Sequence, residues 1–334
     1  MRKIFTLMIL MLSMFMVGCG SNKSDIESYK EASATASKDS AESESSNSKD
    51  KLTIKMLNVG QGDSILIQTK SQNILIDTSD SDEWINSSTK TGLKTELEKA
   101  KVKKIDKLIL THPHADHIGN VKKLTETVEV KEMYDDGVET KSPLYKSYIA
   151  AAKKLGITPK ALKAGDVLDF GNDVKFEVLY PTKEAAKKYG DAKDYNNASV
   201  VGRLVYGKFA MLFTGDAEKN AENEILNSKY KNNLKSTVFK APHHGSKTSA
   251  GADYMKMVAP EYVVISAGDP DNPTGSGNSY GHPHEAALKS YIKNGGVKPE
   301  NIFWTFKNGT ITITTNGNKC TVKPETKTNW IDVK

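Results

Sequence analysis

Short apolar runs separated by polar turns occupy most of the chain from residue 51 onward. Residues 52–59, 64–69 and 73–76 form three such runs, interrupted by Gly60-Gln61-Gly62-Asp63 and by a second tight turn. Runs of this length between turn residues predict β-strands. The same pattern predicts strands at 105–110, 174–180, 199–206, 208–213, 237–240 and 262–266, and a closing β-meander at 302–306, 310–314 and 319–323.

Apolar residues at helical spacing lie between these runs. They predict helices at 91–100, 118–125, 144–155, 217–226, 252–258 and from residue 285 to about residue 294. The two halves of the chain share one plan, a strand-rich sheet with outer helices. We therefore expect an α/β (α+β) fold in which two sheets pack face to face under helices.

The first 19 residues predict a secretory signal peptide. Arg2 and Lys3 precede an uncharged apolar run at 4–17, which is shorter than the roughly 20 residues that a membrane crossing needs. The ending Met16-Val17-Gly18-Cys19 resembles the lipobox of bacterial lipoproteins, so we expect cleavage before Cys19 and lipidation of this cysteine. Lipidation would anchor the protein at the extracellular face of the cytoplasmic membrane. The alternative is an ordinary signal peptide that contains a cysteine.

Residues 20–50 are rich in Ser, Ala, Lys, Glu and Asp and contain almost no large apolar residues. Such a segment cannot bury enough surface to fold, which predicts a flexible tether before a domain at 51–334. Without the signal peptide and tether, 41 basic and 34 acidic residues remain of the 47 and 41 in the whole chain. This positive balance favours an anionic partner, although many basic surfaces are only solvated. We infer no obligate protein partner from the sequence.

All seven histidines fall in three short clusters, and each cluster follows or precedes a predicted element. Neutral imidazole and carboxylate are common ligands of zinc and related metals. The clustering therefore predicts a metal site assembled from three loops, which carry His112, His114 and His117, then His243 and His244, and finally His282 and His284.

The first cluster offers two pairs of ligands. In His112-x-His114, alternate residues at a strand end can point into one space, and Asp116 and His117 follow one loop turn later. Two such pairs can address two adjacent metal ions, whose bridging water would be the nucleophile. The competing interpretation is a surface loop with chance histidines.

Other candidates lie at later strand ends. Asp216 follows Thr214-Gly215 as a metal-bridging ligand or as a helix N-cap, and His243 is favoured over the neighbouring His244 as a ligand. His282 and His284 would complete the site, orient another ligand or only cap a helix. Asp63 and Asp77 are candidate partners of the ligands, or plain turn residues.

Several of these motifs resemble the metallo-β-lactamase superfamily. They are His112-x-His114-x-Asp116-His117, Asp77 before it and Thr214-Gly215-Asp216 after it. Three further motifs are similar to the branch that contains the metallo-hydrolase domain of the ComEC DNA-uptake channel and related phosphorylcholine esterases, namely Asn58-Val59-Gly60-Gln61-Gly62-Asp63-Ser64, His243-His244-Gly245-Ser246 and Tyr280-Gly281-His282-Pro283-His284. The resemblance covers about 51–323 and implies a four-layer αββα sandwich with a dinuclear site at one edge of the sheets.

One position departs from the superfamily pattern. Lactamases and glyoxalases carry a third histidine shortly before the Thr-Gly-Asp motif, where this chain has Asn196 and Asn197. The resembling branch has asparagine there, which implies a weak oxygen ligand or a hydrogen-bond donor. Loss of an imidazole shifts metal preference toward harder ions such as manganese and argues against lactam hydrolysis.

We therefore expect a secreted, lipid-anchored hydrolase that uses two divalent ions, Zn or Mn, to cleave phosphodiesters of nucleic acid or of choline or teichoic phosphate. The expected metal ligands are His112, His114, Asp116, His117, Asp216, His243 and His244. The expected catalytic residues are Asp116, His117, Asn197, Ser246 and Lys247, where Ser246 and Lys247 would contact phosphoryl oxygens. The alternatives are a non-catalytic surface lipoprotein that captures DNA, and a hydrolase of a non-phosphate substrate such as a lactam.

Overall fold

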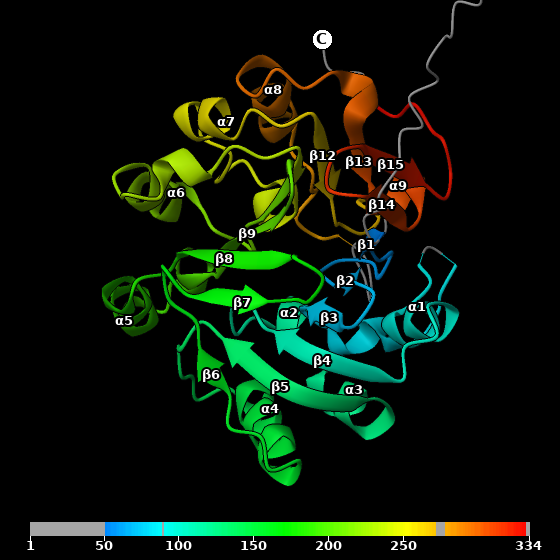
Figure 1. Ribbon diagram of the computed structural model, residues 1–334, viewed down its shortest axis with the longest axis vertical. Coiled ribbons are helices and arrows are strands. Elements are labelled where there is room, and N and C mark those ends of the chain that lie inside the picture. The colour runs from blue at the N-terminus through cyan, green and yellow to red at the C-terminus, as the bar shows by residue number, and fades with distance from the viewer. Residues whose placement is uncertain (1–50, 89, 272–277, 332–334) are drawn as a thin grey trace, which may run out of the picture. The chain divides into compact units, whose positions relative to one another are not determined.

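The computed structural model describes residues 51–88, 90–271 and 278–331 (Figure 1). These residues belong to one compact unit, which spans residues 47–334. Within the described ranges, no helix is long and apolar enough to cross a membrane. The signal peptide, Cys19 and the tether predicted at 20–50 lie outside the described residues and stay predictions.

Among the described residues, eight strands form a first sheet in the order β15-β14-β1-β2-β3-β4-β5-β6. The N-terminal strands β1, β2 and β3 pair antiparallel, and β3, β4, β5 and β6 then run parallel to one another. The strands are β1 (Leu52–Met56), β2 (Ile65–Gln68), β3 (Asn73–Ile76), β4 (Lys104–Ile109), β5 (Glu129–Asp135), β6 (Lys160–Ala161), β14 (Ile311–Thr315) and β15 (Cys320–Pro324).

A second sheet contains seven strands in the described part of the chain, in the order β13-β12-β11-β10-β9-β8-β7. Here β7 to β10 are antiparallel, whereas β10, β11, β12 and β13 are parallel. The strands are β7 (Val167–Asp169), β8 (Lys175–Tyr180), β9 (Val201–Tyr206), β10 (Phe209–Phe213), β11 (Val238–Lys240), β12 (Tyr262–Ile265) and β13 (Ile302–Trp304).

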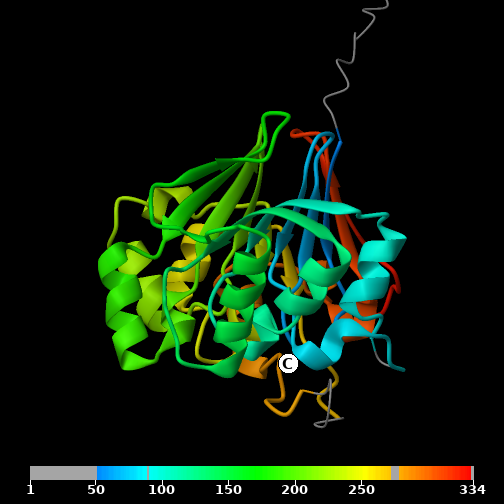
Figure 2. The same cartoon turned by 90° about the horizontal axis from the view of Figure 1, so that it is seen from below.

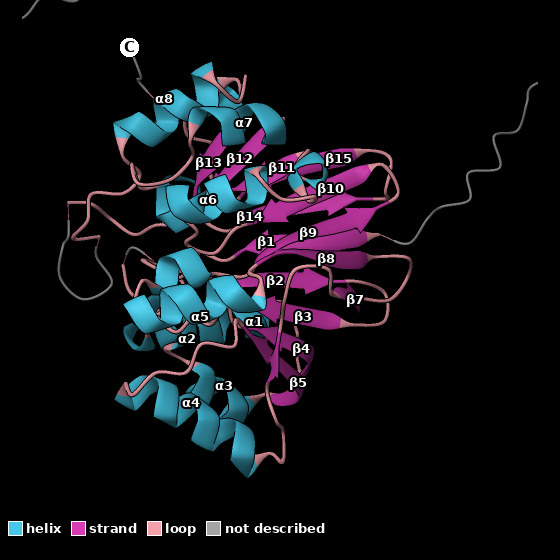
Figure 3. Cartoon of the chain, turned by 90° about the vertical axis from the view of Figure 1, so that its left-hand side faces the viewer, coloured by secondary structure: helices cyan, strands magenta, loops and turns pink. Residues whose placement is uncertain are grey.

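Helices cover the outer faces of both sheets (Figure 2), and α5 and α6 lie in front of the second sheet in Figure 3. The α-helices are α1 (Leu93–Lys99), α2 (Ala115–Ile118), α3 (Val121–Thr127), α4 (Pro143–Lys154), α5 (Lys183–Ala192), α6 (Lys219–Leu226), α7 (Ala252–Val258), α8 (Glu285–Lys293) and α9 (Thr305–Asn308). Short 3₁₀ helices are η1 (Ser81–Trp84), η2 (Tyr195–Ala198), η3 (Lys231–Asn233), η4 (Pro242–Gly245) and η5 (Pro299–Asn301).

The layers follow from strands that are apolar on both faces. In β2, Ile65 and Ile67 pack between the two sheets, while Leu66 points outward against the helices of the first sheet. In β12, Val264 packs between the sheets and Val263 packs against the helices of the second sheet. Because successive side chains of a strand point to opposite faces, continuous apolar runs satisfy both packing layers. The predicted αββα sandwich is confirmed.

The structure differs from the predicted elements in three places. The strands at the chain end do not form one meander, because β13 pairs with β12 in the second sheet whereas β14 pairs with β1 in the first. The helix predicted at 118–125 is two helices, α2 and α3, which are interrupted at Gly119 and Asn120. A β-carbon at Gly119 would lie 2.4 Å from the Ser81 backbone nitrogen, so this close approach requires glycine. The elements β5, β6, β7, α5 and α9 were not predicted, and α9 begins at Thr305 inside the strand predicted at 302–306.

Candidate metal centre

The candidate ligands follow the ends of parallel strands. Asp77 comes directly after β3, and Thr111 and His112 follow β4 in the first sheet. Asp216 follows β10 and His243 follows β11 in the second sheet. Parallel strands bring their carboxyl ends to one edge of a sheet, and the two sheets face each other. Residues from both halves of the chain therefore meet at one edge of the sandwich.

Four of the predicted ligands form the centre of the site. Asp116, His117, Asp216 and His244 each offer one ligand atom, and these atoms all lie within 4.8 Å of one another. The Nε2 atom of His244 lies 3.1 Å from Asp116 Oδ2 and 3.2 Å from Asp216 Oδ2. His117 Nε2 lies 3.3 Å from the same Asp216 oxygen. Asp216 therefore contacts imidazoles from both sheets.

A second pair of nitrogens lies beside this centre. His112 Nε2 and His114 Nδ1 are only 2.9 Å apart, and the rings of His112 and His117 are 4.1 Å apart between centroids. His112 is buried, and His114 opens the one-turn helix α2 as its N-cap. The expected arrangement of alternate histidines that point into one space is present.

Asp77 orients the ligand loop that follows β4. Its Oδ1 accepts a hydrogen bond from the Thr111 backbone N–H at 2.7 Å, and its Oδ2 accepts one from the Thr111 hydroxyl at 2.7 Å. His117 Nδ1 lies 2.8 Å from Asp77 Oδ2, which leaves Nε2 of that ring directed at Asp216. This bond fixes the ring nitrogen that His117 presents to the centre.

The carboxylates set the charge of the buried imidazoles. Burial lowers the pKa of His117, but the carboxylates of Asp216, Asp116 and Asp77 outweigh it and raise that pKa well above its usual value. Burial opposes the ionisation of Asp216, yet its histidine neighbours, His244 first, hold its pKa well below the usual range. The centre is therefore built to hold positive charge among carboxylates.

The residues fit a bound metal ion. In the described residues, His117 Nε2 and Asp216 Oδ1 are buried and have no hydrogen-bond partner. Unpaired buried polar atoms are costly, and functional groups that await a ligand are one explanation for them. Imidazole nitrogens and carboxylate oxygens are also the donor set that Zn²⁺ and Mn²⁺ accept.

Sequence reasoning missed Lys240, a lysine in the buried strand β11. Its ammonium group contacts Asp63, donates a 2.8 Å hydrogen bond to the Gly215 carbonyl and lies 3.7 Å from Asp216 Oδ1. Burial lowers the pKa of Lys240, but Asp63 and Asp216 outweigh this effect and raise it. The signal was present in the sequence, because a lysine that ends an apolar strand must find buried partners.

Glu218 was missed as well. Its Oε1 lies 2.9 Å from His243 Nδ1 and accepts a 2.8 Å hydrogen bond from the Thr248 hydroxyl. His243 Nε2 then lies 3.8 Å from Asp216 Oδ2. His243 thus reaches the centre from its rim, whereas the buried His244 contacts it directly. An acid two residues after Asp216 was the available signal.

Both histidines after β11 have left-handed backbone angles. His243 has φ 47° and ψ 48°, and His244 has φ 54° and ψ 22°. Such angles are costly for residues with a β-carbon and persist where the surrounding structure enforces them. This turn brings the Nε2 atoms of His243 and His244 to 3.8 and 3.2 Å from Asp216 Oδ2.

The remaining predicted residues occupy the rim. His282 is buried and its ring lies 5.3 Å from that of His243, whereas His284 Nδ1 accepts a hydrogen bond from the Lys247 backbone N–H at 3.1 Å. Ser246 is buried and bonds Thr248, and Lys247 is exposed. None of these side chains belongs to the four-residue centre.

The two asparagines take different positions. The Asn197 amide nitrogen donates to both oxygens of Asp194, at 3.1 and 2.9 Å, and its oxygen accepts from the Ala221 N–H at 3.0 Å. These bonds hold η2 against α6 and account for the burial of Asn197, whose catalytic role stays a prediction. Asn196 bonds Glu218 at 3.5 Å, and its buried Oδ1 has no partner among the described residues. Asn196 is therefore better placed than Asn197 to act as an oxygen ligand.

Comparisons with known proteins identify the family of this chain. Residues 57–269 match the family model of the metallo-beta-lactamase superfamily. ComE operon protein 3 of Bacillus subtilis is 32% identical over 270 residues, which cover 77% of this chain and 32% of that protein. Competence protein ComA of Neisseria gonorrhoeae is 30% identical over 239 residues, which cover 72% of this chain and 29% of that protein. The matched region thus spans about a third of the length of these curated relatives.

Solved structures of similar shape include a putative metal-dependent hydrolase from Parabacteroides distasonis, at 19% identity and a TM-score of 0.43, which covers 76% of this chain and 93% of that one. The metallo-beta-lactamase fold protein YhfI from Bacillus subtilis has 12% identity and a TM-score of 0.45, with coverage of 76% and 96%. The family model covers well over half of the chain and includes all the ligand loops up to β12. This chain belongs to the metallo-beta-lactamase superfamily, and the resemblance to its competence-protein branch is confirmed.

Proposed function

We propose that the protein is a metal-dependent phosphodiesterase. The observation that carries this proposal is the convergence of Asp116, His117, Asp216 and His244 within 4.8 Å, with the facing nitrogens of His112 and His114 beside them. These six residues would hold two divalent ions, Zn²⁺ or Mn²⁺. Two bound ions would supply a nucleophilic water and neutralise the negative charge that develops on a phosphoryl group.

The surrounding residues keep this constellation in place. Asp77 holds Thr111 and His117, and Lys240 balances the charge of Asp63 and Asp216 from the buried side. Glu218 holds His243 at the rim. Lys247 is exposed beside this rim, where its ammonium group would bind a phosphoryl oxygen of the substrate.

A phosphodiester substrate is supported by charge and by the relatives. The chain carries a formal net charge of +6, which attracts polyanions. The curated relatives described above are ComE operon protein 3 and competence protein ComA, and the resembling branch includes a DNA-uptake channel. The proposal also includes a lipid anchor at Cys19, which would hold the enzyme at the outer face of the membrane. Replacing Cys19 with Ala should then release the chain from the membrane fraction.

The test uses the full chain, purified without chelator. Metal content is determined first, and hydrolysis of bis-p-nitrophenyl phosphate and of DNA is then measured with added Mn²⁺ or Zn²⁺. Asp216→Ala should lose metal and lower hydrolysis by more than about a hundredfold, beyond the 10–100-fold effects of residues that only support ligands. The matched control Asp253→Ala removes an exposed carboxylate on α7 and should change neither.

Two other results would contradict this proposal. Bound metal without hydrolysis in the presence of any ion, together with salt-sensitive DNA binding, would overturn the proposed enzymatic activity. It would favour a DNA-capture protein. Hydrolysis of a lactam but of no phosphodiester would overturn the substrate class.

A further inference from the structure

Two cavities lie in a row beside the metal centre. The nearer one, of about 600 Å³, is lined by Pro113, His114, Ala115 and Tyr195 and therefore reaches a candidate metal ligand. The farther one, of about 630 Å³, lies between α5 and the loop after β5. Both cavities are lined by Glu139, Gly190 and Asp191, so they adjoin. Together they form one hollow, which we call the α5 groove.

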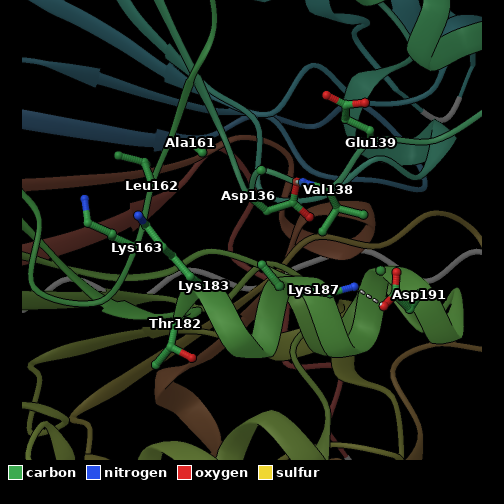
Figure 4. Close-up of a pocket in the computed structure, with 13 residues that line it drawn as sticks. Asp136, Val138, Glu139, Ala161, Leu162, Lys163, Thr182, Lys183, Lys187 and Asp191 are labelled. Atoms are coloured by element: carbon green, nitrogen blue, oxygen red, sulfur yellow. Dashed lines mark hydrogen bonds and ion pairs between the residues drawn. The ribbon is translucent and has the colours of Figure 1, made fainter.

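Five lysines line the α5 groove and outnumber its exposed acids, Glu139 and Asp191. Lys141 and Lys193 line the nearer cavity, and Lys163, Lys183 and Lys187 line the farther one. Lys187 pairs with Asp191 at 2.6 Å, and Lys163 pairs with Asp166 at 3.0 Å. In the described ranges, the other three lysines make no ion pair. Figure 4 shows the farther cavity, where α5 with Lys183 and Lys187 forms the wall that faces Asp136.

Asp136 is a second and independent feature of the farther cavity. Its side chain is 97% buried, with a relative exposure of 3%. Oδ1 accepts a hydrogen bond from the Val138 N–H at 3.1 Å, while Oδ2 has no partner among the described residues. Burial first, and then the neighbouring Asp135, raise the pKa of Asp136 well above its usual value. A carboxyl group that keeps its proton adds no negative charge to the groove and so does not repel a phosphate.

The nearer cavity of the α5 groove also has an apolar part. Pro113, Ala115, Leu144 and Tyr195 line this cavity together with His114 and two of the lysines. The Tyr195 ring lies 5.5 Å from the His114 ring, at the border of the metal centre. Aromatic rings beside a basic groove stack nucleobases, whereas a polyol phosphate has no flat apolar face to place there. The groove therefore fits a nucleic-acid strand better than a teichoic polymer.

We propose that the α5 groove binds single-stranded nucleic acid, with bases against Tyr195 and successive phosphates along the lysines, so that one phosphodiester lies at His114. The inference rests on the proposed function and deepens it by naming the substrate. The strand needs no base-specific contact, because stacking and phosphate neutralisation accept any sequence.

The first test reverses charge at one lysine of each cavity. Lys183 is the first residue of α5, and Lys141 directly precedes Ser142, the N-cap of α4. Glutamate is favourable near a helix N-terminus, so Lys141→Glu with Lys183→Glu should preserve the fold. The full chain is titrated with a fluorescent oligothymidylate of about 12 nucleotides, within the usual site size of a strand-binding groove, in EDTA so that no metal-dependent cleavage occurs.

We expect the double variant to bind at least about tenfold more weakly, with the slope of log K against log salt reduced by about 1.4. The matched control, Lys208→Glu with Lys298→Glu, makes the same change of charge at exposed lysines that line neither cavity. It should bind within about twofold of the wild type, as a small general charge effect would allow. Equally weakened oligothymidylate binding in both double variants would overturn the assignment of the α5 groove as the binding site.

The second test separates bases from phosphates. Tyr195→Ala should weaken oligothymidylate binding about fivefold or more, because base stacking contributes about 1–3 kcal/mol per base. Inorganic polyphosphate and poly(glycerol phosphate) should compete poorly. Undiminished binding by Tyr195→Ala, or equal competition by these base-free polymers, would overturn the nucleic-acid assignment.

The two proposals fail separately. Hydrolysis of bis-p-nitrophenyl phosphate by the wild type tests the phosphodiesterase alone, because this small diester is not a nucleic-acid strand. Absence of that hydrolysis in the wild type would overturn the phosphodiesterase, while the titrations in EDTA would still decide whether the groove binds a strand.

Discussion

Gly62 shows how one residue without a side chain shapes the ligand loop. Its φ is +119°, and a β-carbon there would lie 2.4 Å from the Asp116 carbonyl oxygen. That same oxygen accepts a hydrogen bond from the Asp63 N–H at 3.1 Å. Gly62→Ala should therefore displace Asp116 and lower the free energy of unfolding by about 3 kcal/mol or more, because steric overlap adds to backbone strain.

Gly156 provides the control for Gly62. Its φ is +70°, but nothing lies within 4 Å of an added β-carbon. Gly156→Ala should cost only the backbone term of about 1–2 kcal/mol. Urea unfolding and metal titration of both variants measure the difference. Equal losses of stability, with metal affinity intact in Gly62→Ala, would contradict the argument from the Asp116 contact.

Asp77 tests the support of the ligands. Asp77→Asn keeps the size of the side chain but replaces one acceptor oxygen by an N–H₂ group, which opposes a donor from Thr111 or His117. We expect metal affinity to fall about 10–100-fold and the free energy of unfolding to fall by about 1–3 kcal/mol. Calorimetric titration with Mn²⁺ or Zn²⁺ gives the affinity. Asp106→Asn makes the same change in β4 at an aspartate that accepts from Asn73, so an equal loss of affinity there would refute the role of Asp77.

At the scale of elements, the strands predicted from the sequence are those with apolar residues on both faces. The sequence did not predict β5, because four of the seven residues in Glu129–Asp135 are charged and only Val130, Met133 and Tyr134 are buried. Similarly, α5 buries only Ala185 and Tyr189, which is too narrow a stripe to show helical periodicity. Both elements are stabilised by their neighbours in the tertiary structure, which a local pattern does not record.

The contact between α6 and α7 should make stability depend on pH. Glu222 of α6 accepts hydrogen bonds from the backbone N–H groups of Ala250 and Gly251, at 2.6 and 2.8 Å, where Gly251 is the N-cap of α7. Burial raises the pKa of Glu222 to about 7 from its ordinary 4.5. Because the folded state holds this proton more tightly, the stabilisation is complete below pH 4.5 and is lost as the pH rises through 7.

We therefore expect Glu222 to remove up to about 3 kcal/mol of stability between pH 4.5 and 7. In Glu222→Gln this contribution should vanish, although the amide also loses one acceptor for the two N–H groups. The measurement is urea unfolding of both proteins across that range, with the exposed Glu184→Gln on α5 as the control. A wild type and a Glu222→Gln variant with parallel pH profiles would contradict the assignment.

At the scale of the whole molecule, the three histidine clusters and Asp216 could be predicted to converge because each follows the end of a strand. Their local order could not, because it depends on contacts between distant segments. His244, for example, contacts Asp116 across 128 positions of the chain, and Ser266 bonds Gly62 across 204. The α5 groove was likewise hidden, since its lysines come from three separate segments and meet Tyr195 only in the fold.

The metal centre also joins the two sheets, which gives the last prediction. His117 follows a strand of the first sheet, Asp216 and His244 follow strands of the second, and bound ions would tie these segments together. A ligand that binds only the folded state stabilises it by about 2.7 kcal/mol at a hundred times its Kd. For a domain of this size, we expect chelation to lower the Tm by about 5 °C or more. Because the ligands come from both sheets, one calorimetric transition should move as a whole.

Asp216→Ala decides whether this shift comes from the predicted centre. The variant should lack the metal-dependent part of the Tm, so added Mn²⁺ or Zn²⁺ would leave its transition unchanged, whereas Asp253→Ala should respond like the wild type. A full shift in Asp216→Ala would mean that the ions act elsewhere on the surface. A metal effect confined to a separate, smaller transition would mean that the centre stabilises one sheet only. A single shifted transition that depends on Asp216 would instead make metal binding a property of the entire sandwich.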